Sequence, residues 1–539
     1  MSRASLRGDI FGGLTAAVVA LPLALAFGVA SGLGPLAGVY GAIAVGLMAS
    51  LVGGTPAQIS GPTGPMTVVT AAVVVQYADN LSMVFTIIML GGIMQMLLGL
   101  LKVGKAIAYT PYSVISGFMT GIGIIIILLQ LPAFFGLAQF AGPPASVLLH
   151  LDQLWQSLNL HALLVAVATL LITIFWPMRW RRFLPAPLAA LIIGALLANL
   201  LLTGAPVLGK IPSGLPQLHW PDLSPSLLGQ AIQPAFVLAL LGSIDSLLTS
   251  LVADSLTRTR HSPNRELIGQ GLGNLCAGLI GGISGSGATM RTVVNIQAGG
   301  RGATSGILHA ITLLLLILVL APLTGRIPHA VLAGILLKVG WDIIDWGYLR
   351  VLLKLPRDKV LVMLITLLLT VFVDLITAVA VGLIVAGIVN AMRIEQDELS
   401  RMKARSAADA GDLSEAEQAL LENQEEEVAI LSMTGRFSYA SARALSQRMT
   451  VLDGQHKVLI LDFSQLAYVD PSMALAIRDL LHAAEDNQLD CIIVCHEQDS
   501  LAPLQAFRVF ARTHPDNIVT DRHQAVKRAV TLIQSAGVQ

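Results

Sequence analysis

The stretch Ser60–Val69, with the sequence SGPTGPMTVV, decides the fold of this 539-residue chain. Its two prolines and two glycines break a regular helix, because proline lacks an N–H group and glycine leaves the backbone unrestrained. Apolar runs nevertheless lie on both sides of it, and a closely similar phrase, SGATMRTVV, returns at 286–294. The chain therefore carries the same helix-breaking phrase twice within apolar surroundings.

The composition is that of an integral membrane protein. Hydrophobic residues make up 55% of the chain and charged residues 12%, with a mean hydropathy of +0.74, whereas soluble proteins are roughly 25% charged. Residues 1–392 hold 19 Lys+Arg and 11 Asp+Glu, while residues 393–539 hold 14 and 22. We therefore expect a transmembrane domain over 1–392, a charged linker over 393–426 and an acidic soluble domain over 427–539.

Fourteen apolar stretches in the first domain are expected to be helical and membrane-embedded. They lie at 10–29, 36–53, 63–76, 82–100, 108–129, 161–177, 184–202, 230–252, 267–283, 288–299, 304–321, 329–341, 359–373 and 375–392. Two of them, 63–76 and 288–299, are too short to cross, since 14 residues of helix span about 21 Å of a hydrocarbon core of about 30 Å.

The distribution of basic residues supports this arrangement. If the N-terminus is cytoplasmic and the fourteen stretches alternate in direction, the cytoplasmic segments hold sixteen Lys and Arg residues, and the external segments hold only Lys210 and Arg326. Cytoplasmic loops of membrane proteins carry such an excess of basic residues. We expect both termini to be cytoplasmic, in a bacterial inner membrane.

The two copies of the phrase fall in the third and the tenth stretch, which predicts an inverted repeat of seven plus seven spans with two half-helices. A half-helix that begins inside the bilayer leaves its first N–H groups unpaired, with a partial charge of about +0.5. Two such N-termini facing each other would bind a small anion without any lysine. The alternative is that glycine and proline only kink packed helices. The small and hydroxyl-bearing residues expected at the anion are Gly61, Thr63, Gly64, Gly287, Ala288 and Thr289.

Asp245 lies deep in the eighth stretch, LALLGSIDSLLTSLVADSL. A carboxylate in mid-membrane is costly and by default functional. Thr249 follows one turn later on the same helical face, and a carboxylate, a hydroxyl and backbone carbonyls are suitable ligands for sodium. Two other interpretations stay open, because Asp245 could instead bind a proton or pair with Arg291. Arg291 would then either strengthen the anion pocket or neutralise Asp245.

Apolar runs alternate with amphipathic stretches in the soluble domain. Strands are expected at 428–434, 457–463, 491–495 and 517–519, and helices at 440–451, 472–486, 500–510 and 523–535. This alternation predicts a small α/β domain with a sheet backed by helices.

Four phrases resemble the SulP (sulfate permease) family of anion transporters. They are RGDIFGGLTAAVVALPLALAFGVASG in the first stretch, GPTGPM at the third, GSIDSLLTS in the eighth and SGATMRTVVNIQAGG at the tenth. The likeness covers nearly the whole chain, and the C-terminal domain resembles a STAS domain. Within the family, the likeness is to the sodium-dependent bicarbonate transporters of cyanobacteria.

The resemblance implies functional positions and an architecture. The residues at the family's anion site are Thr63, Gly287, Ala288 and Thr289. The sodium site of the bicarbonate type maps onto Asp245 and Thr249, with help from the backbone of 287–289. The family is built as a core domain (spans 1–4 and 8–11) that moves in an elevator-like manner against a gate domain (spans 5–7 and 12–14). Its members are homodimers, partly through their STAS domains.

At two positions the chain departs from a family pattern. Arg291 matches a basic position of many SulP proteins with other selectivity, which leaves sulfate, chloride or a dicarboxylate open as the substrate. STAS domains that are switched by phosphorylation carry an Asp-Ser-Ser-Gly type loop. The matching stretch here, VDPSM at 469–473, places Ser472 at the phosphoacceptor position but lacks the glycine.

We therefore expect a secondary active transporter that imports a small anion, with bicarbonate favoured and sodium as the coupling ion. The alternatives are a proton-coupled sulfate or dicarboxylate importer, an uncoupled anion channel and a non-transporting sensor. The sequence shows no nucleotide-binding loop, no catalytic triad arrangement and no basic patch on the soluble domain. An enzyme, a further cofactor and a nucleic-acid partner are therefore not expected.

Overall fold

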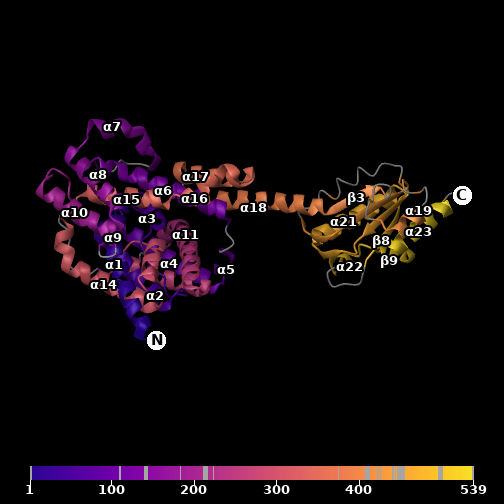
Figure 1. Ribbon diagram of the computed structural model, residues 1–539, viewed down its shortest axis with the longest axis horizontal. Coiled ribbons are helices and arrows are strands. Elements are labelled where there is room, and N and C mark those ends of the chain that lie inside the picture. The colour runs from indigo at the N-terminus through magenta and orange to yellow at the C-terminus, as the bar shows by residue number, and fades with distance from the viewer. Residues whose placement is uncertain are drawn as a thin grey trace. The chain divides into compact units, whose positions relative to one another are not determined.

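The computed structural model describes residues 3–107, 111–138, 144–181, 184–209, 217–221, 224–373, 375–406, 413–421, 424, 426–439, 442, 445, 456–495 and 502–536. The chain divides into two compact units, a helical unit over Met1–Ala386 and a C-terminal unit over Gly387–Gln539. Figure 1 labels the elements of both.

Each of the fourteen predicted stretches overlaps a helix of the structure. The helices are α1 (Arg3–Ala30), α2 (Pro35–Val52), α3 (Gly64–Gln76), α4 (Leu81–Leu100), α5 (Gly104–Ile107), α6 (Tyr112–Phe134), η1 (Pro144–His150), α7 (Leu151–Gln156), α8 (Leu160–Phe175), α9 (Met178–Arg181), α10 (Ala186–Leu200), α11 (Pro225–Thr257), α12 (Pro263–Leu279), α13 (Thr289–Gln297), α14 (Ala303–Thr324), α15 (His329–Ile343), α16 (Trp346–Val351), η2 (Leu352–Lys354), α17 (Arg357–Phe372) and α18 (Leu375–Ser400).

Six of the described helices are long and apolar enough to cross a membrane. They are α1, α2, α4, α6, α11 and α18. A bent pair, Pro144–Gln156 with Leu160–Phe175, would make a seventh if its 119° break lies within one span. Gly64–Gln76, Ala186–Leu200 and Ala303–Val319 are apolar but shorter. The count of fourteen spans therefore stays a prediction.

The helical unit contains two sets of helices that pack mainly among themselves. In the first set, α12 lies against α2 and α4, α14 lies against α1 and α2, and α11 lies against α4. In the second set, α6 lies against α15 and α17, and α8 lies against α10 and α15. Figure 1 labels α1, α2, α4, α11 and α14 of the first set and α6, α8, α10, α15 and α17 of the second.

The C-terminal unit is built on a five-stranded sheet with the order β3-β4-β6-β8-β9. Its strands are β3 (Met402–Ser406), β4 (Val428–Met433), β6 (Val458–Asp462), β8 (Asp490–Val494) and β9 (Ile518–Val519). Only β3 runs antiparallel to its neighbour, and the other pairs are parallel. A second, parallel pair joins β5 (Gly435–Phe437) to β7 (Leu466–Val469).

Helices cover both faces of this sheet, as expected for a parallel sheet whose strands are buried on both sides. Successive residues of β6 show the alternation, since Ile460 and Leu461 belong to different apolar clusters. One cluster includes α21 (Pro471–Asp486) and α22 (Ala502–Ala506), and the other includes α19 (Glu415–Leu421) and α23 (Arg522–Ala536). The four predicted strands are confirmed.

Several elements of this unit were not predicted, namely the strands β3, β5 and β7 and the helix α19. β3 and α19 both lie within 393–426, the range expected to be a charged linker, and β3 pairs with residues 429–433 of β4. The helices expected at 472–486, 500–510 and 523–535 correspond to α21, α22 and α23. Most of the helix expected at 440–451 lies outside the described residues.

Candidate functional site

The two copies of the helix-breaking phrase pair with each other in space. β1 (Ser60–Gly61) and β2 (Ser286–Gly287) form a buried antiparallel ribbon, with Ser60 opposite Gly287 and Gly61 opposite Ser286. Each serine therefore faces the glycine of the other copy, which is the pairing that a two-fold axis generates. The ribbon also supplies hydrogen-bond partners to backbone that would otherwise be unpaired between helix ends.

Gly61 is required at its position in this ribbon. Its φ of +150° is open to glycine and strained for other residues. A Cβ atom there would lie 2.9 Å from Arg291 Nη1 and 3.1 Å from Ala42 Cα. The side chain is therefore excluded by both the backbone conformation and the neighbours.

Two short helices begin directly after the ribbon strands. α3 starts at Gly64 after the extended residue Thr63, and α13 starts at Thr289 after the extended residue Ala288. They contain 13 and 9 residues, which correspond to about 20 Å and 14 Å of helix. A threonine before a helix commonly accepts a hydrogen bond from that helix, but the Thr63 side chain makes no such cap. Its hydroxyl is directed elsewhere.

Thr63 and Ser286 converge on the carboxylate of Asp245. Thr63 Oγ1 donates to Asp245 Oδ2 at 2.9 Å, and Ser286 Oγ donates to the same oxygen at 2.5 Å. The two hydroxyl oxygens lie 2.7 Å from each other. Asp245 is 8% exposed and Ser286 is fully buried. The three oxygens form a compact triangle to which α11, β2 and the residue before α3 each contribute one member.

Thr249 and Thr289 form a second polar contact one turn further along α11. Thr249 Oγ1 donates to the carbonyl of Gly287 at 2.9 Å and lies 2.7 Å from Thr289 Oγ1. The backbone N–H of Gly287 donates to Ser246 Oγ at 3.0 Å. α11 therefore holds the start of α13 through hydroxyl groups, and the carboxylate, hydroxyl and carbonyl oxygens gathered here are hard ligands suited to sodium.

Arg291 crosses between the two half-helices. It is 2% exposed, and its Nη2 donates to the carbonyl of Pro62 at 2.5 Å. Its charge also interacts with the Asp245 carboxylate, although no ion pair joins the two among the described residues. Nη1 is buried without a hydrogen-bond partner in the described part of the chain. Arg291 thus adds a positive charge beside the start of α3.

A second buried carboxylate supports the ribbon from behind. Glu266 of α12 is 1% exposed and accepts hydrogen bonds from the Gly54 N–H at 2.9 Å and from the Gln58 and Gln270 amides at 2.8 Å each. The Gln270 amide also donates to Ser60 Oγ at 2.6 Å. Glu266 is therefore a positioning residue that fixes the chain entering β1.

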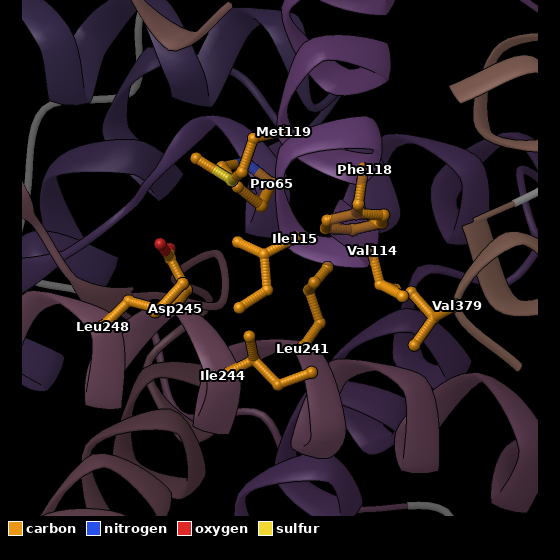
Figure 2. A pocket seen from close by; sticks show the side chains of 10 residues that line it. All are labelled: Pro65, Val114, Ile115, Phe118, Met119, Leu241, Ile244, Asp245, Leu248 and Val379. Atoms are coloured by element: carbon orange, nitrogen blue, oxygen red, sulfur yellow. The ribbon is translucent and has the colours of Figure 1, made fainter. Parts of the chain in front are cut away.

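A small pocket opens beside Asp245, as Figure 2 shows. Its volume of about 20 Å³ leaves room for one or two water molecules. Asp245 is the one polar side chain of its ten lining residues, and its carboxylate lies at one end of an apolar ring that includes Pro65 of α3, Ile115 of α6 and Val379 of α18. The pocket therefore lies where the first helix set meets the second.

The structure places the predicted site residues in two adjoining groups. Thr63 and Asp245 meet in the triangle, while Thr249, Gly287 and Thr289 meet one turn away. Sequence reasoning missed Ser286, Ser246 and the carbonyl of Pro62. Ser286 opens the second copy of the repeated phrase, so its place in the repeat was the available signal. Ser472, the predicted phosphosite, is exposed in the first turn of α21, and its N–H donates to Asp470 Oδ1 at 2.8 Å.

Comparison with known proteins gives matches over most of the chain. Residues 6–366 match the Sulfate permease family and residues 421–525 match the STAS domain. Bicarbonate transporter BicA of Picosynechococcus sp. (strain ATCC 27264 / PCC 7002 / PR-6) is 42% identical over 98% of this chain and 95% of its own length. BicA of Synechocystis sp. (strain ATCC 27184 / PCC 6803 / Kazusa) is also 42% identical, over 98% and 94%. Putative sulfate transporter YvdB of Bacillus subtilis (strain 168) is 31% identical over 90% and 91%.

Solved structures agree with these matches. The transmembrane domain of a cyanobacterium bicarbonate transporter, BicA, superposes with a TM-score of 0.63 at 48% identity, covering 72% of this chain and 98% of that one. The murine anion transporter Slc26a9 in its inward-facing state gives a TM-score of 0.84 over 98% and 92% at 19% identity, which shows a shared fold. The chain thus belongs to the sulfate permease family of membrane transporters, with a STAS domain following its helical unit.

Proposed function

We propose that this protein is a secondary active transporter that imports a small anion, with bicarbonate as the favoured substrate and sodium as the coupling ion. The observation that carries the proposal is the meeting of two half-helix starts at one acidic triangle, Thr63, Asp245 and Ser286. The two BicA relatives at 42% identity are bicarbonate transporters by name, which supports bicarbonate over other oxyanions.

The anion would bind where α3 and α13 begin. Helix N-termini present N–H groups and a partial positive charge to an anion, and the buried guanidinium of Arg291 adds to this field. The substrate-contacting residues of the proposal are Thr63, Gly287, Ala288, Thr289 and Arg291. The apolar ring beside Asp245 would exclude bulk water from the bound anion and so strengthen its electrostatic attraction.

Sodium would bind on the α11 side of the same site. The ligand set of the proposal is the Asp245 carboxylate and the Thr249 hydroxyl, with the backbone of Gly287, Ala288 and Thr289, and we add the Ser286 hydroxyl. All of these are oxygen donors, as a hard cation requires. A bound cation would offset the Asp245 charge, which would otherwise repel the arriving anion.

One observation favours the second candidate, proton coupling with sulfate or a dicarboxylate as substrate. The triangle has three close O···O contacts, between 2.5 and 2.9 Å, but Thr63 and Ser286 supply only two hydroxyl protons. A proton on Asp245 would supply the third hydrogen bond. Asp245 would then carry protons in place of sodium.

The proposed architecture is fourteen spans in a seven-plus-seven inverted repeat, with both termini cytoplasmic in a bacterial inner membrane. The two-fold pairing of the ribbon supports the inverted repeat. The first helix set corresponds to the proposed core (spans 1–4 and 8–11) and the second to the proposed gate (spans 5–7 and 12–14), which supports an elevator-like motion of one against the other. The proposal includes a homodimer held partly through the STAS domains. A scaffold role is favoured for these domains, with regulation by phosphorylation at Ser472 as the alternative.

The test is uptake of radiolabelled bicarbonate, sulfate, chloride and fumarate into proteoliposomes, with a sodium gradient, with a pH gradient and with neither. We expect saturable bicarbonate uptake that sodium stimulates, and loss of this stimulation in Asp245→Asn. Sodium stimulation that persists in Asp245→Asn would overturn the sodium site. Uptake driven by the pH gradient alone would establish the proton-coupled candidate, conductance without saturation would indicate a channel, and the absence of any flux would indicate a sensor.

A further inference from the structure

A basic and aromatic pocket lies within the C-terminal unit, where the end of α18 meets β5 and β7. Its volume is about 560 Å³, and its lining includes Arg393, Arg401, Arg436, Tyr439 and Tyr468. Pockets for small ligands have volumes of about 300–1,000 Å³. Arg436 follows Arg401 by 35 residues in the sequence, and the fold brings it beside Arg393 and Arg401.

The positive charge of this pocket stands out against an acidic background. Residues 393–539 hold 14 Lys+Arg against 22 Asp+Glu, yet three of the arginines gather here. Two carboxylates, Asp397 and Glu398, also line the pocket, so three arginines against two acidic side chains leave a formal charge of +1. Asp397 accepts a hydrogen bond from Arg401 Nη2 at 2.7 Å, and Glu398 accepts one from the Ser438 N–H at 3.0 Å.

The guanidinium groups are held by local contacts. Arg401 packs over Gly435, with Nη1 only 3.2 Å from the place where a Cβ atom would lie, and Gly435 adopts a φ of +93° that favours glycine. The Arg436 guanidinium lies 5.0 Å from the ring centroid of Tyr468. Stacking on the ring face leaves the N–H groups at the guanidinium edge able to donate to an anion. Such edges match the oxygens of a phosphate group.

The position of the pocket along the chain indicates the source of that phosphate. α18 carries no charged residue from Leu375 to Met392, and Arg393 is its first. Ile388 and Met392, one turn apart, are each 56% exposed. An apolar span ends at the level of the lipid headgroups, where arginine and tyrosine are enriched. The pocket therefore begins where α18 leaves the bilayer.

We propose that this pocket binds the phosphate of an anionic phospholipid headgroup, with Arg393, Arg401 and Arg436 as the ligands and the two tyrosines at the membrane interface. A free phosphate ion shares this chemistry. The exposed apolar side chains of Met392 and Ile394, which would lie along the acyl chains, favour the lipid as the source. Binding would attach the C-terminal unit to the membrane surface and make its position depend on the lipid composition.

The test uses the full-length protein in nanodiscs of phosphatidylcholine alone or with phosphatidylglycerol. Hydrogen–deuterium exchange is followed in 393–401 and 435–439. We expect these segments to be protected only when phosphatidylglycerol is present. Since a basic residue near an anionic surface contributes about 1 kcal/mol, the apparent affinity for phosphatidylglycerol should fall about fivefold in Arg436→Gln and about 25-fold in Arg401→Gln/Arg436→Gln.

Lys527→Gln is the matched control, because it removes the same charge from an exposed position on α23 outside the pocket. It should behave as the wild type. Equal protection in both kinds of nanodisc, or an equal loss in Lys527→Gln, would overturn the proposal. Protection in phosphatidylcholine nanodiscs on addition of inorganic phosphate alone would assign the pocket to a soluble anion and would likewise overturn the lipid assignment.

Discussion

Replacing Ser286 by alanine tests the acidic triangle directly. The Ser286 hydroxyl donates to Asp245 Oδ2 at 2.5 Å, and a hydrogen bond to a charged group contributes about 1.5–3 kcal/mol. Thr63 still donates to the same oxygen at 2.9 Å, so the lower value of about 1.5 kcal/mol applies. Since about 1.4 kcal/mol corresponds to a factor of ten, the half-saturating sodium concentration for uptake should rise about tenfold.

The assay is bicarbonate uptake into proteoliposomes over a range of sodium concentrations. Ser243→Ala is the matched control, because Ser243 is also fully buried on α11 but donates to the carbonyl of Ala239 at 2.6 Å. Thr63→Val should resemble Ser286→Ala. In the double variant Thr63→Val/Ser286→Ala, the loss of sodium-binding free energy should exceed the sum of the two single losses, because both hydroxyls donate to one oxygen and lie in contact.

A sodium half-saturation within about twofold of the wild type in Ser286→Ala, at an unchanged maximal rate, would refute this reasoning, because it would separate the triangle from the cation site. If the dependence of uptake on external pH changed while the response to sodium did not, Asp245 would instead be the site of proton binding. Equal effects in Ser243→Ala and Ser286→Ala would show that packing in α11, and not the hydrogen bond to Asp245, is responsible.

Three other changes are expected to have distinct effects. Gly61→Ala should abolish uptake and lower the yield of folded protein, because its Cβ would lie 2.9 Å from Arg291 Nη1 at a φ of +150°; size-exclusion profiles and uptake check this. Glu266→Ala should lower thermal stability by about 2 kcal/mol or more, since three donors, two of them buried, lose their acceptor. Glu266→Gln should retain more of this stability because its carbonyl still accepts. Burial alone would raise the pKa of Glu417. Hydrogen bonds from Arg522 and Ser414 outweigh this effect and hold the pKa below its ordinary value near 4.5. The stabilisation that these hydrogen bonds give is therefore present above about pH 4.5 and is lost as the pH falls through the lowered pKa. Hydrogen-exchange protection of α19 should decline over that pH range in the wild type and remain flat in Glu417→Gln.

The longer helices of the first 392 residues could be predicted because each coincides with an apolar run, and the repeated phrase marked both interruptions. The short helices α5, α7, α9 and α16 have no such run and were not predicted. The residues that surround Asp245 could be predicted only in part. Thr63 and Thr289 lie in the repeated phrase. The hydrogen bond from Ser286 to Asp245, in contrast, depends on how α11 packs against β2, which lies 41 residues further along the chain. No local pattern records which of two neighbouring hydroxyls, Ser286 or Thr289, faces the carboxylate.

Parts of the C-terminal unit could not be predicted from the sequence for a different reason. β3 has the sequence MKARS, whose charges are typical of an edge strand protected against further pairing and equally typical of a loop. Only its pairing with β4 distinguishes the two. The basic pocket was missed in the same way, because Arg393, Arg401 and Arg436 form no run in the sequence. They come together only when α18 and β5 are placed side by side.

The ribbon of β1 and β2 has a consequence for the thermodynamics of transport. Because it joins the starts of α3 and α13 through paired backbone, and α11 is attached to both, these elements are expected to move together as one rigid body. A site carried in this way keeps one intrinsic affinity whichever side of the membrane it faces. Accumulation of the anion then cannot come from tight binding outside and weak binding inside. The electrochemical gradients of the anion and of the ion coupled to it would together set the direction of net flux.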